Sequence, residues 1–430
     1  MRRTQLALLI ASAMLLTHHA QALDLLQAFG EAQTFDSQFS SARAAREASA
    51  EKSVQGRAPL LPAVGLSGNV TKIDSSTRDY TSNNIQIQLK QPLYSPANLE
   101  AYEQTKLQVT ASEIQFAQSQ NDLALRVAQA YFGVLAAQDA LIFIGAQKTA
   151  ITEQLASAKR NFEVGTATIT DTHETQSRFD LTLAQEIAAN NDVEVKRHAM
   201  AQIIGTVPAT LAGLKKSIKL SPPQPANPED WIVTAQEHSF GVTLQQLALE
   251  IARRDISRNR SGHLPTVDFI ASYGRTQGLA FAPDLTLTST SIGVQVTVPL
   301  FAGYGVTSKV RESLALEGKS RADLDTAKRN AAQSARMAYL GVQSGLSQVR
   351  ALEAAEISST SALASNKLGY EVGVRINIDV LNAQQQLYST RRDLAKARYD
   401  TLLNGLKLKA AAGSLAVEDL AQLNALLESR

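Results

Sequence analysis

An internal repeat is the feature that most constrains how this 430-residue chain can fold. Four motifs recur in the same order at an offset of roughly 200 residues. The pairs are Leu61-Pro62-Ala63-Val64 with Leu264-Pro265-Thr266-Val267, Gln91-Pro92-Leu93-Tyr94 with Val298-Pro299-Leu300-Phe301, Ala130-Tyr131-Phe132-Gly133-Val134 with Ala338-Tyr339-Leu340-Gly341-Val342, and Phe162-Glu163-Val164-Gly165 with Tyr370-Glu371-Val372-Gly373. Chance can produce one such pair, but it does not produce four in register. The chain is therefore one structural unit written twice.

Both copies have the same predicted order of elements: a helix, a β-hairpin, a very long helix and a shorter helix. We place the first copy at residues 23–205, with strands at about 64–74 and 84–91, and the second at residues 229–413, with strands at about 266–275 and 289–298. Residues 206–228 form a connector, because Pro222, Pro223 and Pro225 make a poor helix. Residues 414–430 form a C-terminal segment.

The long helices are the most unusual of these elements. We expect them to span about 97–163 and 306–371, and at 1.5 Å per residue each reaches roughly 100 Å. Each copy also has a shorter helix before its hairpin, at about 25–56 and 231–260, and another that begins at Asp171 or Asp379. The two shorter helices together match the long one, so they would lie beside it when stacked end to end.

The strands alternate in polarity, which indicates one apolar and one polar face. Polar loops at about 74–83 and 277–289 join each strand to its partner as a hairpin. If the strands span a membrane, the face that meets lipid comprises Ile85, Ile87, Leu89, Ile292, Val294, Val296 and Val298. A soluble sheet with one buried face shows the same alternation, so the pattern by itself leaves both interpretations open.

Residues 1–22 have the pattern of a cleaved signal peptide. Arg2 and Arg3 precede a short apolar run, and Ala20 and Ala22 supply the small side chains that cleavage requires. An uncleaved N-terminal anchor is the alternative. No later stretch holds ~18 consecutive apolar residues, so beyond the signal only strands closed into a barrel could span a membrane.

Composition argues against several classes of function. The net charge is only +2, which argues against a nucleic-acid partner. Cysteine is absent and the six histidines are scattered, which argues against a metal site. No serine–histidine–acid motif has a recognisable local signature. We therefore expect no enzyme activity and no catalytic, cofactor-binding or metal-binding residues.

Four strands are too few to close a barrel, and this limits the membrane interpretation. An open sheet edge leaves backbone groups unsatisfied in lipid. Several chains would have to share one barrel, with eight strands from two chains or twelve from three.

The doubled hairpin-and-long-helix plan, the segment Tyr370–Asn382 and the tail Ala395–Leu415 resemble the TolC family of outer-membrane channel-tunnels. The resemblance covers nearly the whole mature chain. It implies a mostly α-helical fold with a small transmembrane β-barrel: a homotrimer whose twelve-stranded barrel stands on a long α-helical periplasmic cylinder. It also implies a place in the bacterial outer membrane, in contact with lipid, and two partners, a periplasmic adaptor (membrane fusion protein) and an inner-membrane ABC transporter or RND pump.

The same resemblance implies a gate at the tips of the inner helices. Asp379 matches the family's pore-narrowing aspartate, of which three copies would form a ring of carboxylates. Asn382 stands where the family often has a second aspartate, which implies a single acidic ring and weaker cation selectivity. By sequence alone, Asp379 also fits the N-cap of its helix.

Five further residues fall where the family places the ties that close this gate: Gln154, Thr170, Asp171, Tyr370 and Arg375. Arg375 stands out without the family, because its counterpart in the first copy is Ala167. We expect a charge-assisted pair between Arg375 and Asp171. A solvated arginine that contributes little is the alternative.

The favoured function is a passive conduit of a tripartite export system for type I protein secretion, because the mature chain would begin at Leu23 and not at a lipid-modifiable cysteine. The outer duct of an RND-type multidrug efflux pump shares the fold and is the first alternative. The second is a soluble periplasmic adaptor or coiled-coil protein, which would carry one helical hairpin between β-rich domains and no tandem duplication.

Overall fold

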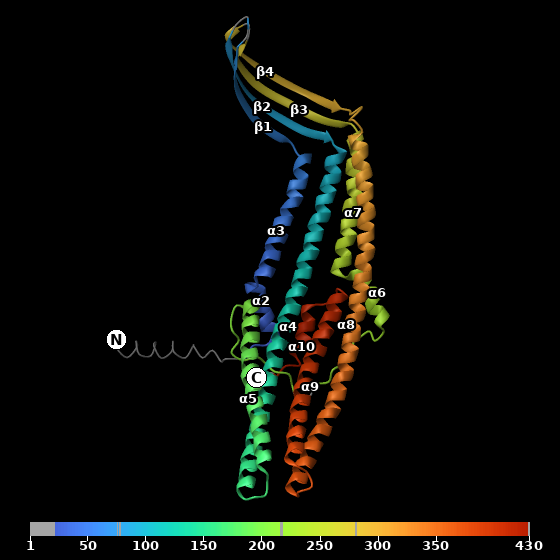
Figure 1. The fold of residues 1–430 in the computed structure, drawn as a ribbon. Helices are drawn as coiled ribbons and strands as arrows, with labels where there is room; N and C mark the ends of the chain where they lie inside the picture. Colours follow the sequence, from blue (N-terminus) through green and yellow to red (C-terminus); the bar gives the residue numbers. More distant parts are fainter. Residues whose placement is uncertain (1–21, 75, 77–78, 216–217, 280–281, 429–430) are drawn as a thin grey trace, which may run out of the picture. The chain divides into compact units, whose positions relative to one another are not determined.

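The computed structural model describes residues 22–74, 76, 79–215, 218–279 and 282–428 (Figure 1). The predicted signal peptide and its Ala20 lie outside the described residues, and only Ala22 of that segment is included.

The order of elements in the first half of the chain recurs in the second half. The first series is α2 (Leu25–Phe35), α3 (Ser37–Arg57), a 3₁₀ turn (Ala58–Leu60), β1 (Ala63–Ile73), β2 (Tyr80–Tyr94), α4 (Pro96–Glu163) and α5 (Ile169–Ile204). The second is α6 (Pro228–His238), α7 (Phe240–Arg260), a 3₁₀ turn (Ser261–His263), β3 (Thr266–Leu279), β4 (Ala282–Thr297), α8 (Gly305–Glu371) and α9 (Asn377–Ala411). A short helix, α10 (Val417–Asn424), follows.

Two of the predicted strands are too short, and the loops are correspondingly too long. β2 begins at Tyr80 where about 84 was expected, and β4 begins at Ala282 where about 289 was expected. Ser82 and Thr286 are among the added residues, and both have partners in the neighbouring strand. Serine and threonine on both faces give no polarity alternation, so the period-two pattern cannot detect a ladder that continues through them.

Each helix predicted before a hairpin is in fact a pair of helices. Asp36 separates α2 from α3, and Ser239 separates α6 from α7. Both residues adopt extended backbone dihedrals. Asp36 also begins α3, because its Oδ1 accepts a hydrogen bond of 2.7 Å from the Phe39 amide. A capping residue can interrupt a helix while the spacing of apolar residues continues across it. The sequence pattern therefore predicted one helix where the structure has two.

The chain forms two compact units. One contains Met1–Ser40, Gln118–Ser239 and Ala331–Arg430, and we call it the helical unit. The other contains Ser41–Ala117 and Phe240–Asn330, and we call it the sheet unit. The long helices α4 and α8 contribute residues to both.

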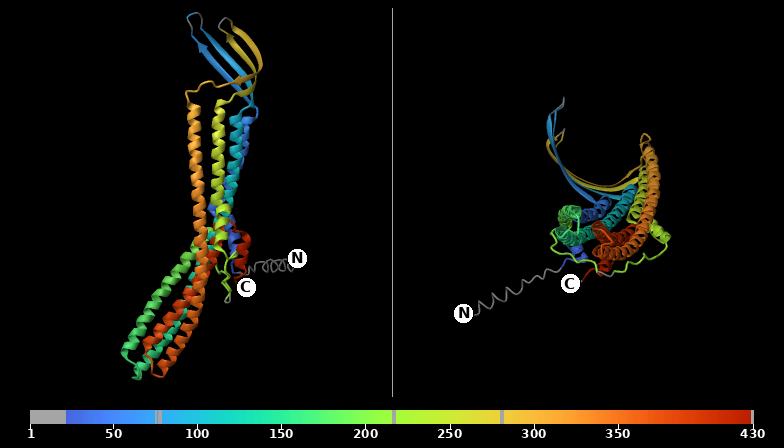
Figure 2. Two further views of the ribbon diagram at one scale, coloured as in Figure 1. Left: turned by 90° about the vertical axis from the view of Figure 1, so that its right-hand side faces the viewer. Right: turned by 60° about the horizontal axis from the view of Figure 1, so that its bottom comes forward.

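The sheet unit holds one antiparallel sheet in the order β1-β2-β3-β4, visible from two sides in Figures 1 and 2. Its two hairpins pair in the same register: Val64 lies opposite Leu89 in the first, and Val267 lies opposite Val296 in the second. β2 and β3 join the hairpins, and the outer edges of β1 and β4 have no neighbouring strand within the described chain.

The register places the predicted lipid-facing residues of the strands on one face. Leu89 is opposite Ala271, which is opposite Ile292, and such directly paired residues point the same way. Most of this face is exposed in the single chain, including Ile85 (60%), Ile292 (71%) and Val296 (61%). Leu285 and Leu287 alternate onto the other face near the end of the second hairpin, so the separation of polarity is cleanest at the end of the sheet nearer the helices.

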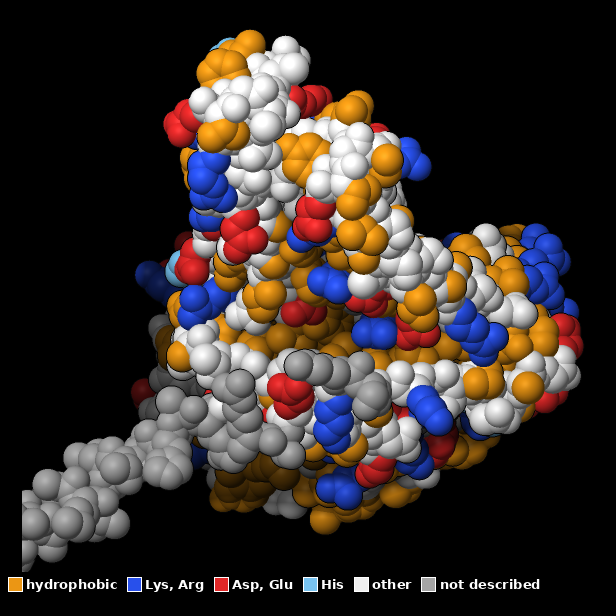
Figure 3. Space-filling model, turned by 90° about the horizontal axis from the view of Figure 1, so that it is seen from below, with side chains coloured by type: hydrophobic (Ala, Val, Ile, Leu, Met, Phe, Trp, Pro, Cys, Tyr) orange, Lys and Arg blue, Asp and Glu red, His pale blue; other side chains and the backbone are white. Residues whose placement is uncertain are grey.

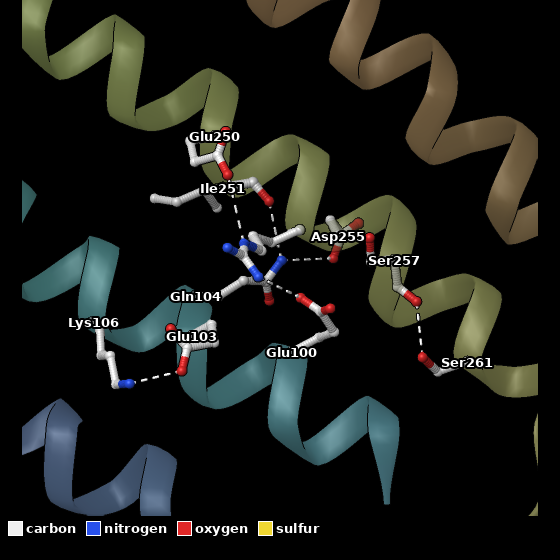
Figure 4. Close-up of polar contacts among 10 residues, drawn as sticks. Glu100, Glu103, Gln104, Lys106, Glu250, Ile251, Asp255, Ser257 and Ser261 are labelled. Carbon is white, nitrogen blue, oxygen red and sulfur yellow. Dashed lines mark hydrogen bonds and ion pairs between the residues drawn. The ribbon is translucent and has the colours of Figure 1, made fainter.

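Polar contacts hold α7 against α4 in the sheet unit (Figure 4). Gln104 is buried, and its Nε2 donates to the Ile251 carbonyl (3.1 Å) and to Asp255 Oδ1 (3.4 Å). Its Oε1 accepts from Arg258 (3.1 Å). With donor and acceptor both satisfied, the amide fixes the axial position of one helix against the other.

The core of the helical unit is centred on α4. Tyr131 and Phe132 are almost fully buried, and the Tyr131 hydroxyl donates to the carbonyl oxygens of Ala212 (2.8 Å) and Leu23 (3.0 Å). Among the described helices, α4 is the one long and apolar enough to cross a bilayer by length and composition. Its buried residues Val127, Val134 and Leu135 belong to this core.

Two glycines of α8 let α9 approach closely. A methyl group on Gly345 would lie 2.5 Å from Thr401 Oγ1 and 3.3 Å from its Cβ. Thr401 is buried and its hydroxyl donates to the Ala397 carbonyl (2.7 Å), so it cannot turn away without losing that bond. Gly341 is in looser contact with Asn404: a methyl group there would lie 3.3 Å from Asn404 Nδ2, which donates to the Gly341 carbonyl (3.3 Å).

We expect Gly345→Ala to destabilise the helical unit by about 1–3 kcal/mol, because the added methyl group overpacks this contact. The midpoint of thermal unfolding, followed by the helical circular dichroism signal, measures the effect. Gly405→Ala is the matched control: this glycine lies in α9 one turn beyond Thr401, and a methyl group there meets nothing within 4 Å. The control should be neutral or stabilising, and an equal loss in both variants would contradict the close approach.

Candidate gate at the helix tips

The turns that connect α4 to α5 and α8 to α9 are built alike. Gly165 and Gly373 both have a positive φ (78° and 79°), which favours glycine. Their amides donate to the carbonyls of Phe162 and Tyr370, respectively. In Figure 1 both turns lie at the lower end of their helix pairs. The repeated Val-Gly motif therefore marks two equivalent helix ends.

The helices that follow these turns start differently. Thr168 is the N-cap of α5, and Asp171 completes a capping box with the Thr168 amide (3.0 Å) and hydroxyl (2.8 Å). Ile376 holds the N-cap position of α9 and has no side chain that can cap. Because α9 begins at Asn377, Asp379 is in its first turn, and the expectation that Asp379 is the N-cap is wrong. Its carboxylate is not used in a cap, unlike that of Asp171.

Arg375 pairs within the chain with Asp379 and not with Asp171. The Arg375 Nη1 lies 3.7 Å from Asp379 Oδ2, and the two side chains are 59% and 34% exposed. Asp171 is engaged by Thr168 instead, which explains why the expected pair does not form in one chain.

Gln154 has a partner that the sequence did not indicate. Its Nε2 donates to Asn377 Oδ1 (2.6 Å), and Asn377 Nδ2 donates to Thr175 Oγ1 (2.7 Å) and to the Asp171 carbonyl (3.4 Å). Asn377 is 1% exposed and Thr175 is fully buried. One asparagine therefore connects α4, α5 and α9. The one signal in the sequence is that its counterpart in the first copy is the apolar Ile169.

Arg178 makes a second tie between α5 and α9 that the sequence did not indicate. It donates to Gln385 Oε1 (2.7 Å) and to Asn382 Oδ1 (3.0 Å). The predicted pore residue Asn382 thus accepts a hydrogen bond from a cation of the other copy. Of the other predicted ties, Tyr370 accepts a long hydrogen bond from Asn161 (3.4 Å), and Thr170 is exposed in the first turn of α5.

An open polar groove lies between α8 and α9 beside these ties. It is lined by Ser358, Ser359, Asn366, Arg375, Asp379 and Asn382. Viewed from below, Figure 3 shows acidic and basic side chains interspersed among hydrophobic ones. Within the described residues, no cluster of three or more histidine, aspartate or glutamate side chains could hold a metal ion. The groove offers hydrogen-bonding groups and one charge pair, but no assembled catalytic group.

Higher in the helical unit, Tyr399 of α9 contacts α4. Its hydroxyl donates to Asp139 Oδ2 (2.7 Å), and its ring lies 5.7 Å from that of Phe132. Burial raises the pKa of Asp139, and the hydrogen bond from Tyr399 opposes this shift. α9 is therefore tied to the first copy near its tip and again higher up.

We expect Asn377→Ala to loosen the tips by about 2 kcal/mol, because the half-buried amide of Gln154 would lose its acceptor and the buried hydroxyl of Thr175 would lose its donor. Hydrogen exchange at the first turns of α5 and α9 measures the local opening. Asn366→Ala is the control, since Asn366 is a half-buried asparagine on α8 whose side chain donates a solvent-exposed hydrogen bond to the Ala362 carbonyl. Unchanged exchange at both helix starts in Asn377→Ala would contradict the role of this node.

Comparisons with known proteins agree with the duplicated order of elements. The family model described as "Outer membrane efflux protein" matches residues 29–206 and again 231–414. The outer membrane protein TolC of Vibrio cholerae is 32% identical, covering 94% of this chain and 93% of that protein. The alkaline protease secretion protein AprF of Pseudomonas aeruginosa is 33% identical over 98% and 90% of the two chains. The proteases secretion protein PrtF of Dickeya chrysanthemi is 30% identical over 95% and 92%.

Solved structures show the same fold. The outer membrane protein VceC of Vibrio cholerae superposes with a TM-score of 0.79, at 17% identity, over 90% of this chain and 96% of that one. CusC superposes with a TM-score of 0.79, at 15% identity, over 91% and 92%.

Proposed function

Since this chain belongs to the family of TolC-like outer membrane efflux proteins, we propose that it is the outer-membrane channel of a type I protein secretion system. The family consists of passive channels and not enzymes, located in the outer membrane and extending into the periplasm. This rules out the soluble periplasmic adaptor. The observation that carries the secretion route is that two relatives of nearly full length are named for protease secretion.

The assembly we propose is a homotrimer. Family channels are homotrimers that work with adaptor and pump partners. Three copies of the four-stranded sheet would supply twelve strands, and closure would give every strand edge a neighbour. The exposed apolar face of Ile85, Ile292 and Val296 would then meet lipid. The partners in this proposal are a periplasmic adaptor and an inner-membrane ABC transporter.

The second candidate is the outer duct of a multidrug efflux pump of the RND type. It is favoured by the relative BepC of Brucella suis, an "outer membrane efflux protein" 24% identical over 96% of this chain. Deletion of the gene distinguishes the two routes. Loss of an exported protein from the medium with unchanged drug tolerance supports secretion, and the reverse result supports efflux.

The mass of the detergent-extracted protein and its behaviour in a planar bilayer test the channel itself. A trimer that forms discrete ion-conducting steps supports the proposal, and a soluble monomer without conductance overturns it.

We expect Arg375→Ala to raise the single-channel conductance several-fold, because the guanidinium occupies the groove beside Asp379 and would tie neighbouring subunits at the tips. Arg392→Ala is the control: this arginine lies farther along the chain, within α9, and its partner is the adjacent, exposed Asp393. Equal conductance in Arg375→Ala and the unmodified protein would count against a closing role for Arg375.

A further inference from the structure

We propose that β4 of one subunit pairs with β1 of the next in one defined antiparallel register, with Val296 directly opposite Gly68 of the partner subunit. This inference rests on the proposed trimer and adds the residues that meet at its seam. It comes from the duplication within the chain, because the seam between β2 and β3 is already an example of one copy pairing with the other.

The first step is to establish which residues of the two hairpins are equivalent. The repeated motifs equate Val64 with Val267 and Gln91 with Val298. Equivalent residues are counted forward from Val64 and Val267 along the first strands and backward from Gln91 and Val298 along the second strands. The pairing within each hairpin supports this: Leu66 lies opposite Ile87, and their equivalents Phe269 and Val294 also lie opposite each other. Two hairpins with the same internal register are interchangeable units of one sheet.

The second step is to use the β2–β3 seam as the template. There, the second strand of the first copy pairs with the first strand of the second copy, with Leu89 opposite Ala271 and Gln88 opposite Ser272. In a closed ring, the second strand of the second copy must pair with the first strand of the next first copy. Val296 and Gln295 are the equivalents of Leu89 and Gln88, and Gly68 and Asn69 are those of Ala271 and Ser272. Val296 therefore faces Gly68 of the partner subunit, and Gln295 faces Asn69 of the partner subunit.

The polarity of both strands agrees with this register. It places Val294 opposite Val70 of the partner subunit on the apolar face, and Thr297 opposite Ser67 of the partner subunit on the polar face. A shift by one residue would place Val294 and Val296 opposite polar residues and turn one strand inside out. A shift by two residues leaves each side chain on the same face of the sheet. The match of polarity therefore excludes only odd shifts, and the β2–β3 pairing selects one register among the even shifts.

The corner after β4 also fits. The matching corner of the first copy is part of the β2–β3 ladder, where a bulge follows Pro92 and Tyr94 pairs with Val267. The second copy has the same motif, but no strand of the described residues lies beside it, and Leu300 and Phe301 are 93% and 75% exposed. The template places Phe301 opposite Val64 of the partner subunit, which would cover an aromatic side chain that a single chain leaves open.

The two seams differ in their polar contacts. Between β2 and β3, Lys90 pairs with Asp268 (3.0 Å) and Thr276 donates to Asn84 (3.2 Å). The equivalents of Lys90 and Asp268 are Thr297 and Gly65, which cannot form an ion pair. The seam between subunits therefore lacks this ion pair and depends on the backbone ladder, apolar pairs and uncharged polar pairs.

Paired cysteines test the register, and the chain offers a clean background because it contains no cysteine. The full-length chain carrying Val296→Cys and Gly68→Cys is produced in the outer membrane, oxidised mildly, and examined on a denaturing gel without reductant. Gly68 accepts a Cβ at ordinary contact distances, 3.7 Å from the Asn84 carbonyl oxygen. We expect a covalent ring of three chains that reductant converts to single chains. Gln295→Cys with Asn69→Cys tests the same register on the opposite face.

The matched controls are Val296→Cys combined with Leu66→Cys or with Val70→Cys, which represent shifts of two residues in either direction. Their Cα atoms would be too far apart for an unstrained disulfide, so we expect at least about tenfold less cross-linked product. Each single-cysteine variant should stay uncross-linked, because the seam joins unlike edges. Stronger cross-linking in a shifted pair, or an intact trimer in which neither predicted pair cross-links, overturns the register. If the unmodified chain forms no trimer, the proposed function itself fails.

Discussion

Channels formed by the Asp379→Asn variant are expected to bind multivalent cations about 10²-fold more weakly than the unmodified channel. Three carboxylates would surround the pore axis in the proposed trimer, and each contributes about 1 kcal/mol to a cation at ~4 Å even in water-like surroundings. Asp379 is well placed for this, since it is not used as a cap and its nearest cation, Arg375, is 3.7 Å away.

Block of the single-channel current by a trivalent cation, measured over a range of concentrations, gives the affinity. Asp393→Asn is the control, because it removes an exposed carboxylate from the same helix, paired with its neighbour Arg392. Arg375→Ala should strengthen the block, since it leaves Asp379 without its partner. If the trivalent cation blocks the Asp379→Asn channel and the unmodified channel with equal affinity, the constriction lies elsewhere.

The second large effect is expected from Arg126→Met, which should destabilise the helical unit by about 3 kcal/mol. Arg126 Nη1 and Nη2 donate to Asp36 Oδ2 (2.7 Å) and Oδ1 (2.9 Å). The Asp36 side chain is 5% exposed, so the variant leaves a buried carboxylate without its cation. The expected loss of stability is at the low end of the range for breaking a buried ion pair, because 31% of the Arg126 side chain is exposed.

The pH dependence of this effect provides an independent check. The hydrogen bonds from Arg126 lower the pKa of Asp36 in the folded chain. A lowered folded-state pKa adds stability above the unfolded pKa of about 3.9, and this stability is lost as the pH falls through the folded value. The difference between Arg126→Met and the unmodified chain should therefore shrink below about pH 4.

Unfolding midpoints in denaturant at pH 7 and pH 3.5 measure both statements. Arg329→Met is the control, since its pair with Asp325 is 78% and 59% exposed and should contribute less than about 0.5 kcal/mol. A similar loss at both pH values would show that Arg126 acts through packing alone.

The sequence was most informative where a pattern repeats. The recurrence of Leu-Pro, Pro-Leu-aromatic and Val-Gly motifs predicted the order of helices and strands, and the alternation around Ile87 and Val294 predicted which side chains share a face. Single interruptions were missed. Asp36 and Ser239 divide helices whose periodicity continues on either side, and Ser82 and Thr286 extend strands without changing polarity.

The site was harder to predict, because its ties join residues about 200 positions apart. Gln154 was expected at the tips, but its partner Asn377 and the pair of Arg178 with Asn382 depend on α5 packing against α9. Asp171 and Asp379 look equivalent in the alignment of the copies. They differ because of the N-cap residue: Thr168 forms a capping box with Asp171, whereas Ile376 cannot cap and leaves the Asp379 carboxylate available. Local pattern cannot reveal a contact that tertiary packing creates.

The shared register of the two hairpins has a consequence for symmetry. If the seams within and between subunits are equivalent, a chain of half this length could close the same ring from six identical subunits. In such a ring all six helix tips would have the same sequence, so a substitution at one tip would be present at all six. Joining two units in one chain lowers six-fold symmetry to three-fold. Alternate tips can then specialise, so that Asn377 and Asp379 act at three of them while Thr168 caps the other three.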